Sequence, residues 1–463
     1  MPDTADLLRR TAALAIEYLD GVGDRPVGQP VAADRLRDAL GRGSLPEAGE
    51  DPTAIVASLA TAVGPGLVAS AGPRYFGFVV GGSLPAALAA DWLTSAWDQN
   101  AFSYAASPAG SVVEETAGRW VRELLGLPSE ASTGFTTGAT VANVVGLAAA
   151  RHAVLARAGW NVEERGLIGA PPIRVIAGDE VHASALQALR VVGLGTGTEA
   201  LERVPVDGQG AMRAEEAARM LRGADGPAIV LAQAGNVNTG ACDPLREVID
   251  AAHGVGAWVH VDGAFGMWAA ASPRYRQLVE GLEAADSWAL DCHKWLNVPY
   301  DCGFVAVRDR EAHYAAMRMS AAYLVPAVGG DLDPFDWVPE GSRRARAIPV
   351  YAALRSLGRN GVAELVDRCC SLARRTAERL AAEDGITILN DVVLNQVLVR
   401  FGDDDARTRA VIAAVQEDGT LWAGGTTWRG TAAMRISVSG WATTEADIDR
   451  SADAIIRCAR AVA

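Results

Sequence analysis

Lysine is almost absent from this sequence. Lysine and arginine together number 42 among the 463 residues, and reading along the chain shows that Lys294 is the only lysine. Arginine stays protonated in proteins and cannot form an imine, so the chain has a single side-chain amine that can act as a nucleophile. Because arginine serves as the cation everywhere else, the retention of Lys294 indicates a chemical role.

Other common signals are missing as well. The six cysteines show no CxxC pair and no metal-ligand spacing, so we expect reduced thiols, a cytoplasmic location and no metal site. The net charge of −14 disfavours nucleic acid and anionic membrane surfaces as partners. The first residues lack the basic and apolar regions of a secretory signal, and we find no apolar run long enough to cross a bilayer.

The middle of the sequence alternates short apolar runs with helix-length segments. Each run is nearly continuous in apolar character and rich in β-branched residues. Such runs are typical of a mostly parallel sheet that is buried on both faces, so we predict an α/β fold. The predicted strands are Ile173–Ala177, Ala228–Gln233, Ala257–Val261, Ser287–Leu290 and Gly303–Val307.

This pattern divides the chain into three predicted domains. Residues 1–85 are helix-like with proline and glycine breaks, and residues 86–345 form a large α/β domain. Residues 346–463 contain long amphipathic helices (350–357 and 362–382) followed by strand-like segments (392–401 and 434–438), so a smaller α+β domain is expected there. Residues 326–346, rich in Gly, Pro and Asp, are predicted to be a long functional loop, often a lid in enzymes.

Several predicted element ends carry residues suited to a cofactor. Small and hydroxyl residues at 136–140 open a long helix, and backbone N–H groups at a helix N-terminus bind phosphate. Asp262 follows one predicted strand at its carboxyl end, where open α/β sheets bind ligands, and a carboxylate there can keep a pyridinium nitrogen protonated. Lys294 follows the next strand, and His182, whose ring could stack or exchange a proton, follows a third. Taken singly, each residue except Lys294 is equally an ordinary cap, turn or core residue.

The segment around Lys294 resembles the cofactor-lysine segment of the group II pyridoxal-5′-phosphate (PLP) dependent amino-acid decarboxylases, with their aromatic-L-amino-acid branch closest. The resemblance runs from about residue 73 to the C-terminus. Its motifs are Phe102–Pro108, Thr137–Asn143, His182–Ser184, Asn238–Gly240, His260–Asp262 and Ala285–Gly303. The resemblance implies PLP fold type I, a PLP cofactor joined to Lys294 as a Schiff base, and a homodimer. The active site would lie at the subunit interface, with residues 1–85 clasping the partner.

The resemblance also implies how the cofactor is held. Ala139 and Thr140 would bind its phosphate, with His293 contributing from beside the lysine. His182 would stack on one face of the ring, and Ala264 would press against the other.

Further site residues follow from the same resemblance. Asp262 would pair with the ring nitrogen, and Gln233 stands near the cofactor where the family has a small hydroxyl residue. The substrate-pocket stretches suggest an apolar or aromatic amino acid as substrate. The residues in these stretches are Phe78, Val79, Val80 and Tyr104.

One departure from the family concerns the reaction. Decarboxylases of this branch carry a loop tyrosine that is thought to protonate Cα after carbon dioxide leaves. The corresponding position is Pro334, with Phe335 beside it, and no tyrosine lies between Tyr323 and Tyr351. The first hypothesis is α-decarboxylation of an L-amino acid. The alternatives are aldehyde synthesis by coupled oxidative deamination, transamination and side-chain cleavage. An inactive protein with a binding role is disfavoured by the retained Lys294.

The first prediction concerns Lys294 itself. Lys294→Arg should keep the fold and the charge but lose the covalent link to the cofactor, because a guanidinium does not form an imine. The measurement is borohydride reduction followed by peptide mass spectrometry, which should find reduced cofactor on Lys294 of the wild type and none on the variant. A label on the N-terminal amine instead would show that the assignment is wrong.

Overall fold

The computed structural model describes residues 3–28, 31–223, 225–322, 324 and 332–462. The chain divides into two compact units. The small unit comprises Met1–Val80, Arg375–Leu389 and Leu398–Ala463, and the large unit comprises Gly81–Arg374 and Asn390–Val397. The three-domain division stays a prediction.

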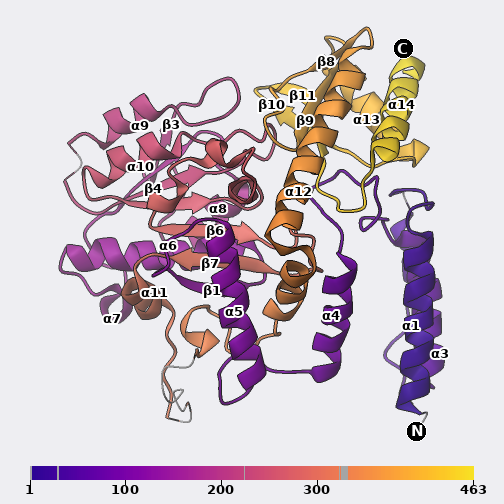
Figure 1. Cartoon of the computed structure of the whole chain (residues 1–463), viewed down its shortest axis with the longest axis horizontal. Coiled ribbons are helices and arrows are strands. Elements are labelled where there is room, and N and C mark those ends of the chain that lie inside the picture. The colour runs from indigo at the N-terminus through magenta and orange to yellow at the C-terminus, as the bar shows by residue number, and fades with distance from the viewer. Residues whose placement is uncertain (1–2, 29–30, 224, 323, 325–331, 463) are drawn as a thin grey trace. The chain divides into compact units, whose positions relative to one another are not determined.

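A seven-stranded sheet forms the centre of the large unit, in the order β1-β7-β6-β5-β4-β2-β3 (Figure 1). Strands β3, β2, β4, β5 and β6 pair in parallel, whereas β7 runs antiparallel to both β1 and β6. The mixed, mostly parallel sheet confirms the predicted α/β fold. The strands are β1 Ser132–Thr136, β2 Arg174–Gly178, β3 Leu201–Val204, β4 Ala228–Gln233, β5 Trp258–Asp262, β6 Ser287–Asp291 and β7 Gly303–Val307.

The five strands predicted from apolar runs are all present, each within about one residue of its predicted bounds. The two strands that the pattern missed, β1 and β3, lie at the two edges of the sheet. Strand β1 has the sequence STGFT and β3 the sequence LERV, so neither forms a continuous apolar run. Edge strands need less apolar surface than central ones, and this is why the pattern did not reveal them.

Helices surround the sheet, and α6 is central to the packing. It contacts β1 and the neighbouring strands β4 to β7, and most of its side chains are buried. Contrary to the sequence expectation, α6 is long and apolar enough to cross a membrane by length and composition, but 67% of its apolar window is buried inside the fold. This burial is typical of a core helix. The helices are α4 Pro85–Trp97, α5 Pro108–Leu124, α6 Ala139–Arg157, α7 Val162–Arg165, α8 Ala183–Val191, α9 Ala214–Leu221, α10 Leu245–His253 and α11 Arg310–Met317.

Helix α12 (Ala347–Ala381) consists of two helical segments separated by a kink at Gly358, where φ is +62°, and so confirms the two predicted helices at 350–357 and 362–382. The predicted strand 392–401 is shorter than expected, because β9 begins at Gln396. Val392 has a φ of +47°, which is incompatible with an extended strand, and Asn390 donates a hydrogen bond to the carbonyl of Thr239 at 3.0 Å.

The small unit contains a four-stranded sheet in the order β10-β11-β9-β8 and the N-terminal helices. Helices α1 to α3 bury none of their side chains, which leaves leucine and isoleucine side chains exposed along them. The strands are β8 Ile386–Ile388, β9 Gln396–Phe401, β10 Gly424–Trp428 and β11 Thr431–Ser437. The helices are α1 Thr4–Gly21, α2 Ala33–Leu40, α3 Pro52–Val63, α13 Asp405–Asp418 and α14 Glu445–Ala461.

The predicted loop at residues 326–346 is buried over much of its described part. Residues 326–331 lie outside the described residues, so the prediction of a lid there is not addressed. Phe335 is buried, and its N–H donates to the carbonyl of Phe102 at 2.9 Å. Arg343 is fully buried and pairs with Glu114 at 2.6 Å. These contacts anchor the second half of the segment in the large unit.

The buried pair Arg343–Glu114 generates a stability prediction. Glu114→Ala would leave a guanidinium buried without its partner, which typically costs about 3–5 kcal/mol of unfolding free energy. The exposed pair Arg119–Glu123 on the same helix is the matched control, and Glu123→Ala should cost about 1 kcal/mol or less. Thermal unfolding of both variants is the measurement, and equal midpoints for the two would contradict the assigned importance of the buried pair.

Candidate active site

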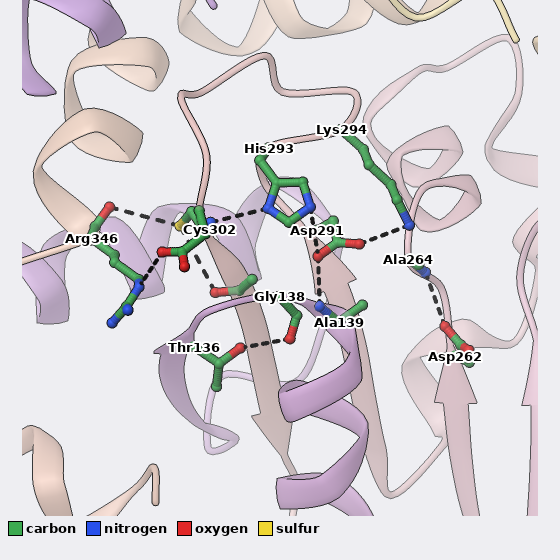
Figure 2. Close-up of polar contacts among 12 residues, drawn as sticks. Thr136, Gly138, Ala139, Asp262, Ala264, Asp291, His293, Lys294, Cys302 and Arg346 are labelled. Atoms are coloured by element: carbon green, nitrogen blue, oxygen red, sulfur yellow. Dashed lines mark hydrogen bonds and ion pairs between the residues drawn. The ribbon is translucent and has the colours of Figure 1, made fainter. Parts of the chain in front are cut away.

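The carboxyl ends of β4, β5 and β6 bring the central site residues together. Gln233 at the end of β4 pairs in register with Asp262 at the end of β5. Beyond the strands, the backbone continues the pairing, because the N–H of Asp291 donates to the carbonyl of Ala264 at 2.9 Å. Asp262, Ala264, Asp291 and the Lys294 side chain therefore lie along one rim of the sheet (Figure 2).

Asp291, the last residue of β6, holds three groups of this site. One carboxylate oxygen accepts the backbone N–H of Ala139 at 2.6 Å and lies 3.4 Å from Nε2 of His293. The other lies 2.8 Å from Nζ of Lys294 (Figure 2). Only 5% of the Asp291 side chain is exposed, so these contacts are shielded from water. The carboxylate therefore fixes the amine next to the N-terminus of α6.

The protonation of His293 follows from its contacts. Its Nδ1 accepts the backbone N–H of Cys302 at 3.0 Å, so in the neutral ring the proton sits on Nε2 and faces Asp291. Burial lowers the pKa of His293, which favours this neutral form. The N–H of Ala139 and Nε2 of the imidazole thus both face one anionic oxygen.

The chain segment that carries Lys294 is held in place on both sides. Asn297, at φ +56°, donates from its backbone N–H and its side-chain amide to the carbonyl of Lys294, both at 3.2 Å. The backbone of Gly81 lies against the same carbonyl, where a Cβ would approach to 2.2 Å. Only glycine fits there, and the close packing limits movement of the lysine backbone.

These residues fit a phosphate-bearing pyridine aldehyde. The Ala139 N–H donates to an anionic oxygen of Asp291, and Nε2 of His293 lies 3.4 Å from the same oxygen, so both groups can face the kind of oxygen that a phosphate presents. Asp262 supplies a buried carboxylate for a ring nitrogen, with one oxygen accepting the Ala264 N–H at 3.3 Å. Lys294 supplies the amine for an aldehyde. The chemistry of PLP needs all three groups within the length of one small molecule.

His182 and Gln233 lie near this rim. His182 caps the N-terminus of α8, and its Nδ1 accepts the backbone N–H of Ser184 at 3.2 Å. Val181, immediately before it, lines a small cavity together with Gln233 and Asp262. The sequence predicts that residues following β2 lie near those at the end of β5. The lining of this cavity agrees with that prediction, because Val181 and Asp262 both line it.

The predicted substrate residues fall in both compact units. Phe78, Val79 and Val80 belong to the small unit, whereas Tyr104 belongs to the large one and donates its backbone N–H to Asp333 at 2.8 Å. Phe78 and Val79 both have positive φ values, +52° and +60°, which is uncommon for non-glycine residues and strained for a β-branched one. Strain of this kind is often found at binding sites.

Three residues of the site were missed from the sequence, namely Asp291, Asn143 and His260. Asp291 ends a predicted strand as Asp262 does, so the same rule would have found it. Asn143 lies one turn after Ala139 on α6 and donates to Asp262 at 3.3 Å. His260 lies on the same face of β5 as Asp262 and contacts Asn143 at 2.8 Å. For Asn143 and His260, the available sequence signal was a polar residue within an otherwise apolar helix or strand.

A mostly parallel sheet with an amine, a buried carboxylate and an anion-accepting helix end on one rim defines a PLP-dependent enzyme of fold type I. Residues 37–401 match the family model described as the pyridoxal-dependent decarboxylase conserved domain, and the chain belongs to this family. PLP is accordingly its cofactor, and it is a PLP-dependent decarboxylase, a lyase.

Individual relatives agree with this assignment. The chain is 28% identical to an aromatic-L-amino-acid decarboxylase from Bacillus atrophaeus over 84% of this chain and 79% of that protein. It is 25% identical to a phenylacetaldehyde synthase from Arabidopsis thaliana over 96% of this chain and 94% of that protein. The crystal structure of Oryza sativa TDC with PLP and tryptamine has the same fold, with a TM-score of 0.91, 24% identity and coverage of 100% and 99% of the two chains.

The site geometry generates a prediction for Asp262. Asp262→Asn should leave PLP bound but lower turnover by about a hundredfold or more, since a neutral amide does not hold a proton on the ring nitrogen and each 1.36 kcal/mol is about tenfold in rate. Asp309→Asn is the matched control, because it keeps a side-chain acceptor at the N-cap of α11. Steady-state kinetics of both variants are the measurement, and an Asp262 variant within about threefold of wild type would remove Asp262 from this role.

Proposed function

We propose that this enzyme decarboxylates the α-carboxylate of an L-amino acid with an apolar or aromatic side chain, with Lys294 carrying the cofactor. The observation that supports this most is the row of groups on one rim, in which Asp291 joins the Lys294 amine to the N-terminus of α6 beside the buried Asp262. When bound, PLP withdraws electrons from the Cα bond that stands perpendicular to its ring.

We assign roles to the chain's own residues from the family resemblance and from their positions. Lys294 would carry the cofactor covalently, and Asp291 lies beside its amine. The N-terminus of α6, at Ala139 and Thr140, and the Nε2–H of His293 bind the phosphate. Asp262 holds a proton on the ring nitrogen, which preserves the ring's capacity to accept electrons.

We propose that residues at the ends of helices and strands contact the faces and the edge of the cofactor ring. His182, at the N-cap of α8, would stack on one face and Ala264 would lie against the other. Gln233, at the end of β4 and in register with Asp262, would face the cofactor edge. Contacts from these side chains would fix the position of the cofactor ring and so orient the substrate relative to it.

An apolar or aromatic substrate is supported by the surroundings of Phe78. Its side chain is 60% exposed and packs on Trp422 at 5.2 Å, and Tyr75 stacks on the same indole at 5.1 Å. This cluster presents aromatic surface next to Val79 and Val80. Phe78, Val79, Val80 and Tyr104 are the residues that we propose to contact the substrate, and an aromatic substrate agrees with the name of the Bacillus relative, an aromatic-L-amino-acid decarboxylase.

Aldehyde formation is the second candidate outcome. Pro334 and Phe335, which stand where the family's loop tyrosine is expected, form a buried turn without a hydroxyl group. The proton for Cα must then come from another group, and His182 is the proposed donor. Slow proton delivery would leave time for reaction with oxygen and release of an aldehyde, and a relative from Arabidopsis thaliana is named phenylacetaldehyde synthase. Transamination and side-chain cleavage remain further alternatives.

We also propose a cytoplasmic homodimer with the active site at the subunit interface. Leu8 on α1 and Leu59 on α3 are 59% and 50% exposed, and no side chain of α1 to α3 is buried. A second copy covering these helices would remove this apolar surface from water. All six cysteines are free thiols, which is typical of a reducing compartment.

The reaction outcome is tested by the products. Without the loop tyrosine, the wild type should release some aldehyde, ammonia and peroxide beside the amine when oxygen is present. Phe335→Tyr adds one hydroxyl to the native ring, and Pro334→Tyr places one next to it, so both should raise the amine-to-aldehyde ratio. His182→Gln should lower this ratio and the overall rate, because the proposed acid is removed.

The measurement is the amine-to-aldehyde ratio with and without oxygen, in the wild type and all three variants. Wild-type protein and Phe335→Tyr differ by a single oxygen atom, so each serves as the control for the other. Clean amine production by the wild type that is unaffected by His182→Gln would contradict both the proposed acid and the consequence drawn from the missing tyrosine.

A further inference from the structure

A line of buried polar side chains leads through the large unit to Asp262. Trp258, His260 and Asp262 alternate along β5 and so face the same side of the sheet. Ser287 on β6 pairs in register with His260, and Asn143 reaches them from α6. All five side chains are buried, although the mechanism proposed above uses only Asp262.

Consecutive members of this line are hydrogen-bonded. Nε1 of Trp258 lies 2.9 Å from Oγ of Ser287, and that oxygen lies 2.8 Å from Nδ1 of His260. Nε2 of His260 lies 2.8 Å from Oδ1 of Asn143, whose amide nitrogen lies 3.3 Å from Oδ2 of Asp262. The other oxygen of Asp262 accepts the N–H of Ala264, so both carboxylate oxygens are held.

The residues at the two ends of this line determine which atom donates and which accepts in each of its hydrogen bonds. An indole N–H only donates, so Ser287 accepts from Trp258. At the other end, the Asp262 carboxylate only accepts, so the amide of Asn143 donates to it and presents Oδ1 to Nε2 of His260. Burial lowers the pKa of His260 to about 3, so the ring is neutral near pH 7 and carries one proton. That proton is on Nε2 and is donated to Asn143, so Nδ1 accepts the hydrogen of Ser287.

Helix α6 packs directly against this line. A Cβ on Gly146 would come within 2.5 Å of Cε1 of His260, so the helix lies directly on the imidazole. Ala139 and Asn143 lie one turn apart on this helix and meet Asp291 and Asp262, respectively. The same rigid helix therefore contacts both ends of the proposed cofactor site.

We propose that Asn143, His260 and Ser287 are positioning residues that form a one-way hydrogen-bond relay and hold the Asp262 carboxylate toward the ring nitrogen of the cofactor. This inference rests on the role of Asp262 in the proposed function. Breaking the relay at Ser287 leaves Nδ1 of His260 without a donor. The imidazole proton can then move to Nδ1, Asn143 turns its amide to keep a donor toward His260, and its oxygen repels the Asp262 carboxylate.

The test uses the holoenzyme reconstituted with PLP that is labelled with ¹⁵N in the ring. The ¹⁵N chemical shift reports the fraction of ring nitrogen that is protonated, which a general loss of stability does not change. Ser287→Ala should lower this fraction at least about twofold and weaken PLP binding to the apoenzyme by about tenfold, as expected when a hydrogen-bond chain to a charged group is broken. Ser287→Thr keeps the hydroxyl and should restore both values.

The chain offers a matched control in a second buried serine–histidine pair. Oγ of Ser132 lies 2.8 Å from Nδ1 of His313, and Nε2 of His313 lies 2.8 Å from the carbonyl of Trp337. This pair ends on a backbone carbonyl instead of a carboxylate. Ser132→Ala should therefore lower the melting temperature about as much as Ser287→Ala does, with no change in the ¹⁵N shift.

Two more variants separate the possible outcomes. Trp258→Phe removes the first donor and keeps most of the ring, so it tests the relay even if Ser287→Ala does not fold, and it should shift the ¹⁵N signal in the same direction. Asp262→Asn should change the signal most. If Asp262→Asn changes the signal while Ser287→Ala and Trp258→Phe both leave it at the wild-type value, the relay is wrong and the role of Asp262 stands. If Asp262→Asn leaves the signal unchanged, the proposed role of Asp262 fails, and the relay fails with it.

Discussion

The carboxylate of Asp291 is the contact on which the arrangement of the active site depends. This carboxylate is nearly inaccessible to water. One of its oxygens contacts the Ala139 N–H and the His293 imidazole, and the other contacts the Lys294 amine. Without this carboxylate, the amine on a loop after β6 would have no fixed relation to the N-terminus of α6. Because the carboxylate is buried, its interactions with these groups are stronger than those of an ion pair on the surface.

Helix α6 then relates the two ends of the site to each other. Its first turn faces Asp291, and its second turn, at Asn143, faces Asp262. The composition of this helix resembles that of a membrane span. It is this apolar because the helix packs against the middle of the sheet. A long buried helix gives a rigid spacing, and the few polar side chains that it carries are therefore placed accurately.

The fold was largely predictable from the sequence, because central strands must be apolar on both faces and so form recognisable runs. The edge strand β1 and residues 392–395 were not, since their conformation depends on neighbours distant in the chain. In the site, Lys294 was identified by the absence of other lysines and Asp262 by its place after a strand. Asn143 and His260 were missed because their role depends on contacts between α6, β5 and β6. The substrate residues Phe78, Val79, Val80 and Tyr104 rest on resemblance, and neither compact unit by itself brings them together.

The central claim, that the enzyme removes the α-carboxylate of an amino acid, is tested most directly with substrates labelled at that carbon. The holoenzyme would be incubated with each L-amino acid carrying ¹³C in the α-carboxylate, and released carbon dioxide would be measured by mass spectrometry. The account predicts labelled carbon dioxide from at least one apolar or aromatic amino acid, equal in amount to the amine and aldehyde together. Consumption of substrate with the label retained in a keto acid or in a side-chain cleavage product would contradict it.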